Sequence, residues 1–88
     1  MKVINLRKRN IGKLRAFFDV VYENKGVPVL TLRNMKLIET ETGMWPAAPG
    51  DAHLENGKQV YEAHYSIDCL QMMYQIGKEA VKAYHGNK

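Results

Sequence analysis

Hydrophobic and polar residues alternate over the first quarter of the chain. Seven apolar side chains follow even-numbered positions: Ile4, Leu6, Leu14, Ala16, Phe18, Val20 and Tyr22. A period of two is typical of half-buried strands. Between the two apolar runs, the segment Arg9–Lys13 contains Asn and Gly, which favour a turn. We therefore predict an N-terminal β-hairpin.

The same alternation constrains how the two strands pair. Because the apolar positions are even on both strands, the numbers of paired residues are expected to have an even sum, and an odd sum would set Ile4 and Leu6 opposite charged residues. Even pairing gathers four odd-numbered side chains on the other face: Arg7, Arg9, Arg15 and Phe17. Like charges opposite one another cost stability, so this arginine-rich face calls for a functional explanation.

The middle of the chain predicts further strands. Val27–Leu32 is rich in β-branched residues and favours a strand. Lys36–Glu39 and Met44–Ala48 predict a second hairpin, with Gly43 supplying the positive φ of its turn. Pro46 cannot donate a ladder hydrogen bond, which limits Met44–Ala48 to the edge of a sheet.

The last third changes from turns to a helical period. Pro49–Asp51 predicts a loop, and Asn56–Gly57 is typical of a tight turn before a short strand at Gln59–His64. After Ser66, a suitable N-cap, apolar residues recur at steps of three and four, and Gly86 favours a helix end. An N-terminal antiparallel β-sheet built from hairpins and followed by one C-terminal α-helix is an α+β fold.

The length of 88 residues predicts a single domain, residues 1–88, with a small core. One cysteine, Cys69, excludes an internal disulfide, and no Cys/His spacing is typical of zinc. The chain lacks both a run of about 18 apolar residues that could span a membrane and the start of a secretory signal. We therefore expect a cytoplasmic protein, without membrane contact, that gains stability as a homodimer.

Charge is distributed unevenly along the chain. The formal net charge is +4, but residues 1–18 carry six cations and no acid, whereas the other 70 residues carry seven cations and nine acids. The excess of positive charge therefore lies on the predicted N-terminal hairpin. Such asymmetry indicates an anionic partner.

The stretch from Leu32 to Pro49 contains Leu37-Ile38-Glu39, a turn ending in Gly43, and Met44-Trp45-Pro46-Ala47-Ala48-Pro49. These residues, in this order, resemble the stage V sporulation protein G (SpoVG) family. Further similarity lies in Lys2-Val3 with Arg7 and Arg9, in Ala16–Val20, in the Asn56–Gly57 turn and in a helix ending near Tyr84. The chain departs from the family pattern at Pro46, usually a β-branched position, and after Pro49, where a hydroxyl residue and lysines are usual.

The resemblance implies a small α+β protein that dimerises through its sheet and binds DNA or RNA as a regulator, as in sporulation and septation. The departure after Pro49 removes the loop cations that would serve such binding. In this chain the cations lie instead on the N-terminal hairpin.

The basic hairpin holds the candidate nucleic-acid-binding residues. Arginine and lysine neutralise phosphates, and an exposed aromatic ring stacks on unpaired bases. The candidates are Arg7, Lys8, Arg9, Lys13, Arg15 and Phe17. Two alternatives remain open: the cations only solvate an exposed sheet face, or the hairpin docks a protein partner without touching nucleic acid.

Large apolar side chains near the C-terminal half suggest packing or dimer contacts. The candidates are Met44, Trp45, Met73 and Tyr74. Trp45 suits a core or dimer role better than stacking on a base, and a methionine stripe at helical spacing is more often packing than a metal site. Cys69, beside Leu70, is expected to be a small buried hydrophobe.

Catalysis finds no support in the sequence. It contains no nucleophile–base pairing, no Gly-rich phosphate loop and no acid pair in a catalytic context. His53, His64 and His85 fall in three separate predicted elements. We therefore expect a protein that is not an enzyme, with no catalytic residue, metal, cofactor or small-molecule substrate.

Overall fold

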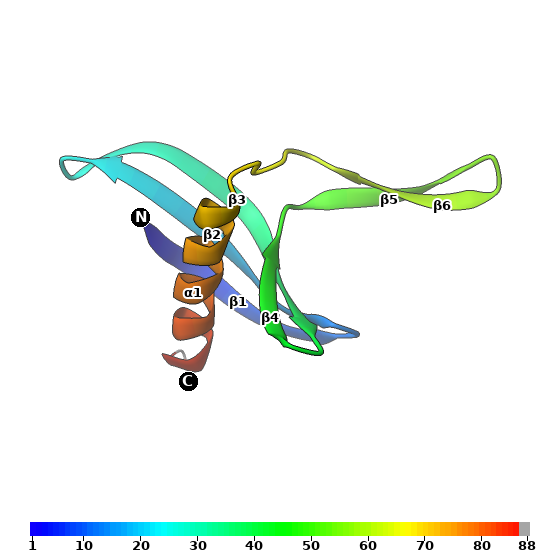
Figure 1. Ribbon diagram of the computed structural model, residues 1–88, viewed down its shortest axis with the longest axis horizontal. Helices are drawn as coiled ribbons and strands as arrows, with labels where there is room; N and C mark the ends of the chain where they lie inside the picture. The colour runs from blue at the N-terminus through cyan, green and yellow to red at the C-terminus, as the bar shows by residue number, and fades with distance from the viewer. Residues whose placement is uncertain (87–88) are drawn as a thin grey trace.

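The structure is a computed structural model that describes residues 1–86. Its elements are β1 (Lys2–Ile11), β2 (Leu14–Asn24), β3 (Val27–Thr40), β4 (Gly43–Ala47), β5 (Gly50–Glu55), β6 (Lys58–Ala63) and α1 (Leu70–Gly86). Strands β1 to β4 form one antiparallel sheet in the order β1-β2-β3-β4, and β5 pairs with β6 in a second sheet (Figure 1). Hairpins followed by one helix confirm the predicted α+β fold.

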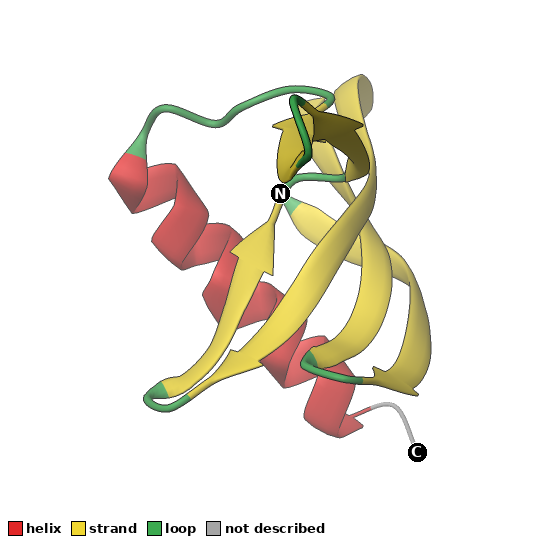
Figure 2. Ribbon diagram, turned by 90° about the vertical axis from the view of Figure 1, so that its right-hand side faces the viewer, coloured by secondary structure: helices red, strands yellow, loops and turns green. Residues whose placement is uncertain are grey.

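The core lies between α1 and one face of the four-stranded sheet, and no helix of residues 1–86 covers the other face (Figure 2). Its fully buried side chains are Ala16, Phe18, Val20, Met35, Leu37, Ile76 and Ala80. The even-numbered residues of β2 therefore face the helix, as the period of two predicts. Because neighbours along a strand point to opposite faces, Phe17 faces away from the helix.

The register of β1 with β2 changes at Asn5, which has a φ of 53°. After this residue Arg7 pairs with Phe17, as the even sum requires, but before it Ile4 pairs with Asp19. The prediction of an even sum along the whole hairpin is therefore wrong. A β-bulge adds one residue to a strand, and asparagine tolerates the left-handed backbone that such a bulge uses.

Strand β3 runs without a break through Val27–Thr40, where two separate segments were predicted. Asn34, with a φ of 59°, forms a second bulge. As a result Leu32 and Met35 both pack on the core although they are three residues apart. The bulge at Asn34 changes which residue numbers of β3 face the core. The alternation of apolar residues is therefore interrupted there although the strand continues.

Strand β4 forms one edge of the sheet, as predicted from Pro46. Gly43 has a φ of 136° and occupies the expected turn. A Cβ added to Gly77 of α1 would lie 2.9 Å from Cδ of Pro46, closer than real side chains approach. The glycine in the middle of the helix therefore allows α1 to cross directly over β4.

Strands β5 and β6, with the turn between them, form a hairpin that we call the arm (Gly50–Ala63). The predicted loop at Pro49–Asp51 is wrong, because β5 already begins at Gly50. A Cβ on Gly50 would lie 2.7 Å from Cζ of Tyr61, so the absence of a side chain lets the tyrosine ring cover this position. The predicted turn at Asn56–Gly57 is confirmed, with φ values of 52° and 79°.

The backbone of the arm approaches no other strand or helix of the described chain. Figure 1 shows it projecting from the sheet, and the molecule measures 48 × 28 × 21 Å. Leu54 is 77% exposed and Tyr61 is 51% exposed. The arm therefore has no hydrophobic core of its own.

Helix α1 begins later than predicted. The N–H of Met73 donates to the carbonyl of Cys69 (3.1 Å), which makes Cys69 rather than Ser66 the residue at the helix boundary. Ser66 instead donates through Oγ to Asp68 (3.1 Å). The connection from β6 to α1 runs from His64 to Cys69, and it includes the first residues of the predicted helix. Cys69 is exposed, so the prediction of a buried cysteine is also wrong.

Candidate nucleic-acid interface

The structure brings two of the predicted binding residues together on the uncovered face of the sheet. Phe17 on β2 pairs with Arg7 on β1 and with Lys36 on β3. A half-buried aromatic side chain thus lies in a row between two cations on three adjacent strands. Neighbouring strands are about 4.8 Å apart, so the three side chains are direct neighbours.

This row lies in a groove of about 970 Å³ that we call the basic groove. It runs from the sheet to the base of the arm. Its lining comes from β1, β2, β3 and the segments on either side of the arm: Arg7, Phe17, Thr31, Leu32, Arg33, Asn34, Lys36, Pro49, Gly50, His64 and Tyr65. Three cations and two aromatic rings therefore line one concave surface.

One buried carboxylate organises the arginines of this groove. Asp19 is 4% exposed and lies between the two asparagine bulges. Its Oδ2 accepts a hydrogen bond from Nδ2 of Asn5 (3.0 Å), and its Oδ1 accepts one from the backbone N–H of Asn34 (2.9 Å). Arg7 and Arg33 lie 3.8 and 3.9 Å from these oxygens. The carboxylate thus partly balances the two guanidinium charges and holds both near the groove.

Opposing effects act on the pKa of Asp19. Burial raises it, whereas the hydrogen bonds from Asn5 and Asn34 and the charges of Arg7 and Arg33 lower it. The lowering effects together are larger, so the pKa lies below its ordinary value. Asp19 is therefore ionised at neutral pH despite being buried.

Arg7 is held in place by more than this ion pair. Its Nη2 also donates to Oδ1 of Asn34 (3.0 Å), which belongs to the bulge of β3. A guanidinium group has five N–H donors, so these contacts leave others free for a ligand. The side chain is 37% exposed, which gives a ligand access to it.

The arm contributes polar side chains at the rim of the groove. Nζ of Lys36 donates to the hydroxyl of Tyr61 (3.1 Å) and lies 4.7 Å from the centre of its ring. The same hydroxyl donates to the carbonyl of Ala48 (2.8 Å). His64 lies 3.0 Å from Asp51, and this contact, first through hydrogen bonding and then through charge, lowers the pKa of Asp51. These contacts fix the base of the arm beside the sheet.

Tyr65 closes the groove along β3. Its hydroxyl donates to the carbonyl of Arg33 (3.3 Å). Burial, with a smaller contribution from the charge of Asp19, raises the pKa of Tyr65. The hydroxyl is therefore neutral at physiological pH and acts as a hydrogen-bond donor.

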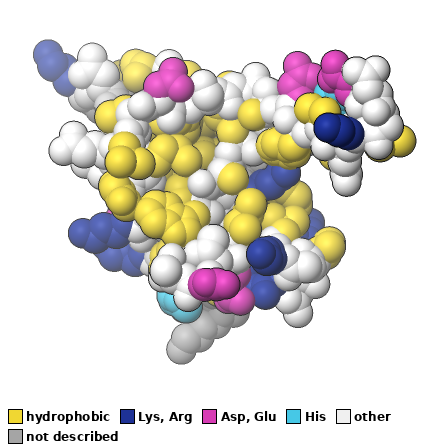
Figure 3. All heavy atoms as spheres, turned by 45° about the vertical axis from the view of Figure 1, so that its right-hand side comes forward, with side chains coloured by type: hydrophobic (Ala, Val, Ile, Leu, Met, Phe, Trp, Pro, Cys, Tyr) yellow, Lys and Arg dark blue, Asp and Glu magenta, His cyan; other side chains and the backbone are white. Residues whose placement is uncertain are grey.

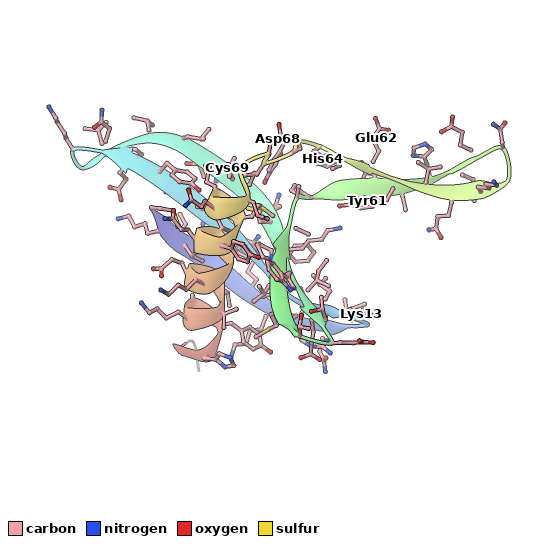
Figure 4. The ribbon with its side chains drawn as sticks, in the orientation of Figure 1. Lys13, Tyr61, Glu62, His64, Asp68 and Cys69 are labelled. Atoms are coloured by element: carbon pink, nitrogen blue, oxygen red, sulfur yellow. The ribbon has the colours of Figure 1, made fainter. Side chains whose placement is uncertain are left out.

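The remaining predicted cations lie outside the basic groove. Lys13 lies at the tip of the β1–β2 hairpin, away from Tyr61 and His64 (Figure 4). Arg15 is held by Oε2 of Glu39 (3.2 Å) and by neighbouring carbonyl groups, which leaves its side chain 21% exposed.

Lys8 and Arg9 lie at the end of the sheet, close to the end of the helix. Nζ of Lys8 is 4.8 Å from the centre of the Tyr84 ring, and Arg9 donates to the carbonyl of Lys8 (2.8 Å). Both line a shallow cleft of about 500 Å³ together with Arg15 and Glu39. The structure thus divides the predicted basic face between the groove and this cleft.

The predicted packing residues lie at β4 and α1. The rings of Trp45 and Tyr74 are 5.3 Å apart, and the two side chains are 37% and 54% exposed. They line a second groove of about 350 Å³, which we call the Trp45 groove, together with the half-buried Met44. Met73 is half-buried on α1. Figure 3 shows hydrophobic side chains gathered on the body of the molecule below the projecting arm.

Arg33, Lys36, His64 and Tyr65 are groove residues that the sequence analysis did not select. Lys36 was detectable in principle, because the pairing of β2 with β3 sets it opposite Phe17. Nothing in the residue pattern marks the other three. They reach the groove through the bulge in β3 and the path of the chain after the arm.

Residues 1–86 contain no cluster of three or more metal-ligating side chains. The helix in this part of the chain is too short and too polar to cross a membrane.

Comparison with known proteins finds no counterpart: no protein-family model, curated protein or solved structure matches the chain. The resemblance to the SpoVG family therefore remains a prediction from the residues.

Proposed function

We propose that this protein binds nucleic acid through the basic groove and acts as a regulator rather than as an enzyme. The observation that carries the proposal is the row formed by Arg7, Phe17 and Lys36 across three strands. Cations gathered in a concave surface attract a polyanion, and a ring between them offers a base a stacking surface.

Further cations lie outside the groove, on the hairpin of β1 and β2. Arg9 and Lys13 are exposed on the same hairpin as Arg7, and neither forms an ion pair with an acidic side chain of residues 1–86. Exposed cations such as these contact the phosphates of a nucleic acid. Phosphate contacts position the nucleic acid without selecting its sequence. In the described part of the chain, no helix lies on the open face of the sheet to read a duplex groove (Figure 2). We therefore expect binding with little sequence selectivity.

We further propose that the protein works as a homodimer in the cytoplasm. The arm supports a second copy, because a two-stranded hairpin that stands alone is only marginally stable in water. Its exposed Leu54 and Tyr61 would gain burial against a partner. A single exposed cysteine, Cys69, fits a reducing compartment.

Salt-dependent binding tests the nucleic-acid proposal. Labelled DNA and RNA oligonucleotides are titrated at about 50 and 200 mM salt. Three phosphate contacts predict a loss of affinity of roughly 20-fold for a single strand and roughly 40-fold for a duplex. The double variant Arg7→Gln, Lys36→Gln should bind more weakly and show a smaller salt dependence. The control is Lys78→Gln, Lys82→Gln, which removes the same charge from exposed positions of α1 and should leave binding unchanged.

A second function is favoured by the Trp45 groove. Tryptophan and tyrosine are enriched among the residues that dominate protein interfaces, so Trp45 and Tyr74 suit docking of a protein. Trp45 is the one tryptophan of the chain, and its fluorescence therefore reports on this groove. An emission that shifts to the blue as protein concentration rises, without salt-dependent binding of nucleic acid, would favour a protein-interaction module.

A further inference from the structure

The open face of the sheet presents one aromatic side chain at its centre. Ala16 and Phe18 are fully buried against the helix, which directs Phe17 to the opposite face. The one helix of the described residues lies on the other side of the sheet, and Phe17 is only half-buried. A flat ring accessible on a sheet is the element on which RNA-binding sheets and single-strand-binding barrels stack unpaired bases.

The surroundings of Phe17 are concave. The arm leaves the sheet at Pro49–Gly50 and the chain returns at His64–Tyr65, so these segments form a wall along the basic groove. A duplex is read by a convex element, such as a helix or a ribbon, that enters its groove. A concave surface with its ring at the floor admits a base only when that base is not paired within a duplex.

The cations flank the ring on both sides. Arg7 and Lys36 are each one strand, or about 4.8 Å, from Phe17 across the sheet. Arg33 lies three residues before Lys36 on β3, across the bulge at Asn34. Asp19 and Asn34 hold the guanidinium of Arg7, which lines the same groove as Phe17. The phosphates on either side of a base stacked on Phe17 would each meet a cation.

We infer that the basic groove binds single-stranded nucleic acid, with one base stacked on Phe17 and the adjoining phosphates on Arg7 and Lys36. This inference rests on the proposed function and specifies its ligand. It also assigns different tasks to the two kinds of side chain: the ring supplies affinity that does not depend on salt, and the cations supply affinity that does.

The first test compares ligands on the full chain. A thymidine oligonucleotide, a uridine oligonucleotide and a DNA duplex, all of the same length, are titrated by fluorescence anisotropy at one salt concentration. We expect the single strands to bind at least about fivefold more tightly than the duplex, because the duplex forgoes one stacked base.

The second test separates stacking from charge. Phe17→Leu keeps an apolar side chain but removes the ring, and we expect single-strand affinity to fall between about 5-fold and 150-fold with an unchanged salt slope. Arg7→Gln should instead reduce the salt slope by about 0.7. Tyr74→Leu, which removes an exposed ring outside the groove, is the matched control and should leave binding unchanged.

Phe17→Trp provides the rescue, because indole retains a stacking surface, and circular dichroism checks that each variant is folded. Duplex binding as tight as single-strand binding, or full single-strand affinity in a folded Phe17→Leu, would overturn the inference while the proposed function stands. If Phe17→Leu does not fold, the comparison of ligands and the Phe17→Trp variant decide the matter. Absence of salt-dependent binding to every ligand would instead reject the proposed function.

Discussion

The four-stranded sheet with α1, which we call the body (β1–β4 and α1), and the arm are both built on antiparallel hairpins, yet their apolar side chains differ in burial. Phe18 and Val20 of β2 are fully buried, whereas Leu54 of β5 is 77% exposed and Tyr61 of β6 is 51% exposed. Tight turns and alternation therefore suffice to form a hairpin, but the core under α1 is what stabilises the body. The arm depends on its turn, on the contacts at its base and, we propose, on a second copy of the chain.

The largest expected effect lies in the core of the body. Phe18→Ala removes a fully buried ring and should lower the free energy of unfolding by about 3–5 kcal/mol. Urea denaturation measures this loss. Leu54→Ala in the arm is the comparison and should change the global stability by less than about 0.5 kcal/mol. Similar losses in the two variants would show that the arm belongs to the same cooperative core.

The next largest effect concerns Asp19, the buried charge of the body. Asp19→Asn keeps its shape but weakens the hydrogen bonds and ion pairs, and should cost about 1–3 kcal/mol at neutral pH. Because the pKa of Asp19 is lowered in the folded state, its contribution is present above the unfolded value of about 3.9 and is lost as pH falls through the lower folded value.

Denaturation of both proteins between about pH 7 and pH 2 measures this effect. We expect wild type to lose stability faster than Asp19→Asn below about pH 4, so that the difference between them narrows. Parallel curves would mean that Asp19 does not contribute through its charge.

A smaller effect is expected where the arm meets the body. Tyr61→Phe keeps the ring but removes the hydroxyl that binds Ala48 and Lys36. The free energy that holds the arm against the sheet should fall by about 0.5–1.5 kcal/mol. Hydrogen exchange should reveal faster opening of β5 and β6, with the amides of β2 unchanged. Equal acceleration in both regions would contradict a separately stabilised arm.

The smallest effect on the stability of a single copy is expected for Leu54→Ser at the exposed end of the arm. Substitutions at such positions usually change stability by less than about 0.5 kcal/mol. If the arm binds a second copy, however, the variant should dissociate at higher protein concentration than wild type does. Light scattering across a dilution series measures this difference, and a wild type that is monomeric at every micromolar concentration would refute the dimer.

Sequence reasoning succeeded where one local rule decided the structure. The alternation of Ala16, Phe18 and Val20 predicted the buried face of β2, and Asn56–Gly57 predicted the turn of the arm. It failed where the chain left a regular period. The bulges at Asn5 and Asn34 shift the apolar positions of β1 and β3, and the return from the arm delays the helix beyond Ser66.

Only part of the candidate site could be predicted for the same reason. Arg7 and Phe17 are close in sequence and belong to one hairpin, so the pairing of that hairpin brings them together. Arg33 and Tyr65 come from distant segments, and their place in the groove depends on a bulge and on the path of a connection. No periodic pattern records either feature.

The two asparagine bulges also have a consequence for the length of the chain. Removing Asn5 from β1 would leave the partners of Ile4 and Arg7 unchanged, because the bulged residue is additional to the ladder. The same holds for Asn34 in β3. The sheet can therefore lose either residue without changing its strand pairing. Asp19, however, depends on both: a chain shortened at both positions would keep its topology but leave this buried carboxylate without its closest hydrogen-bond donors.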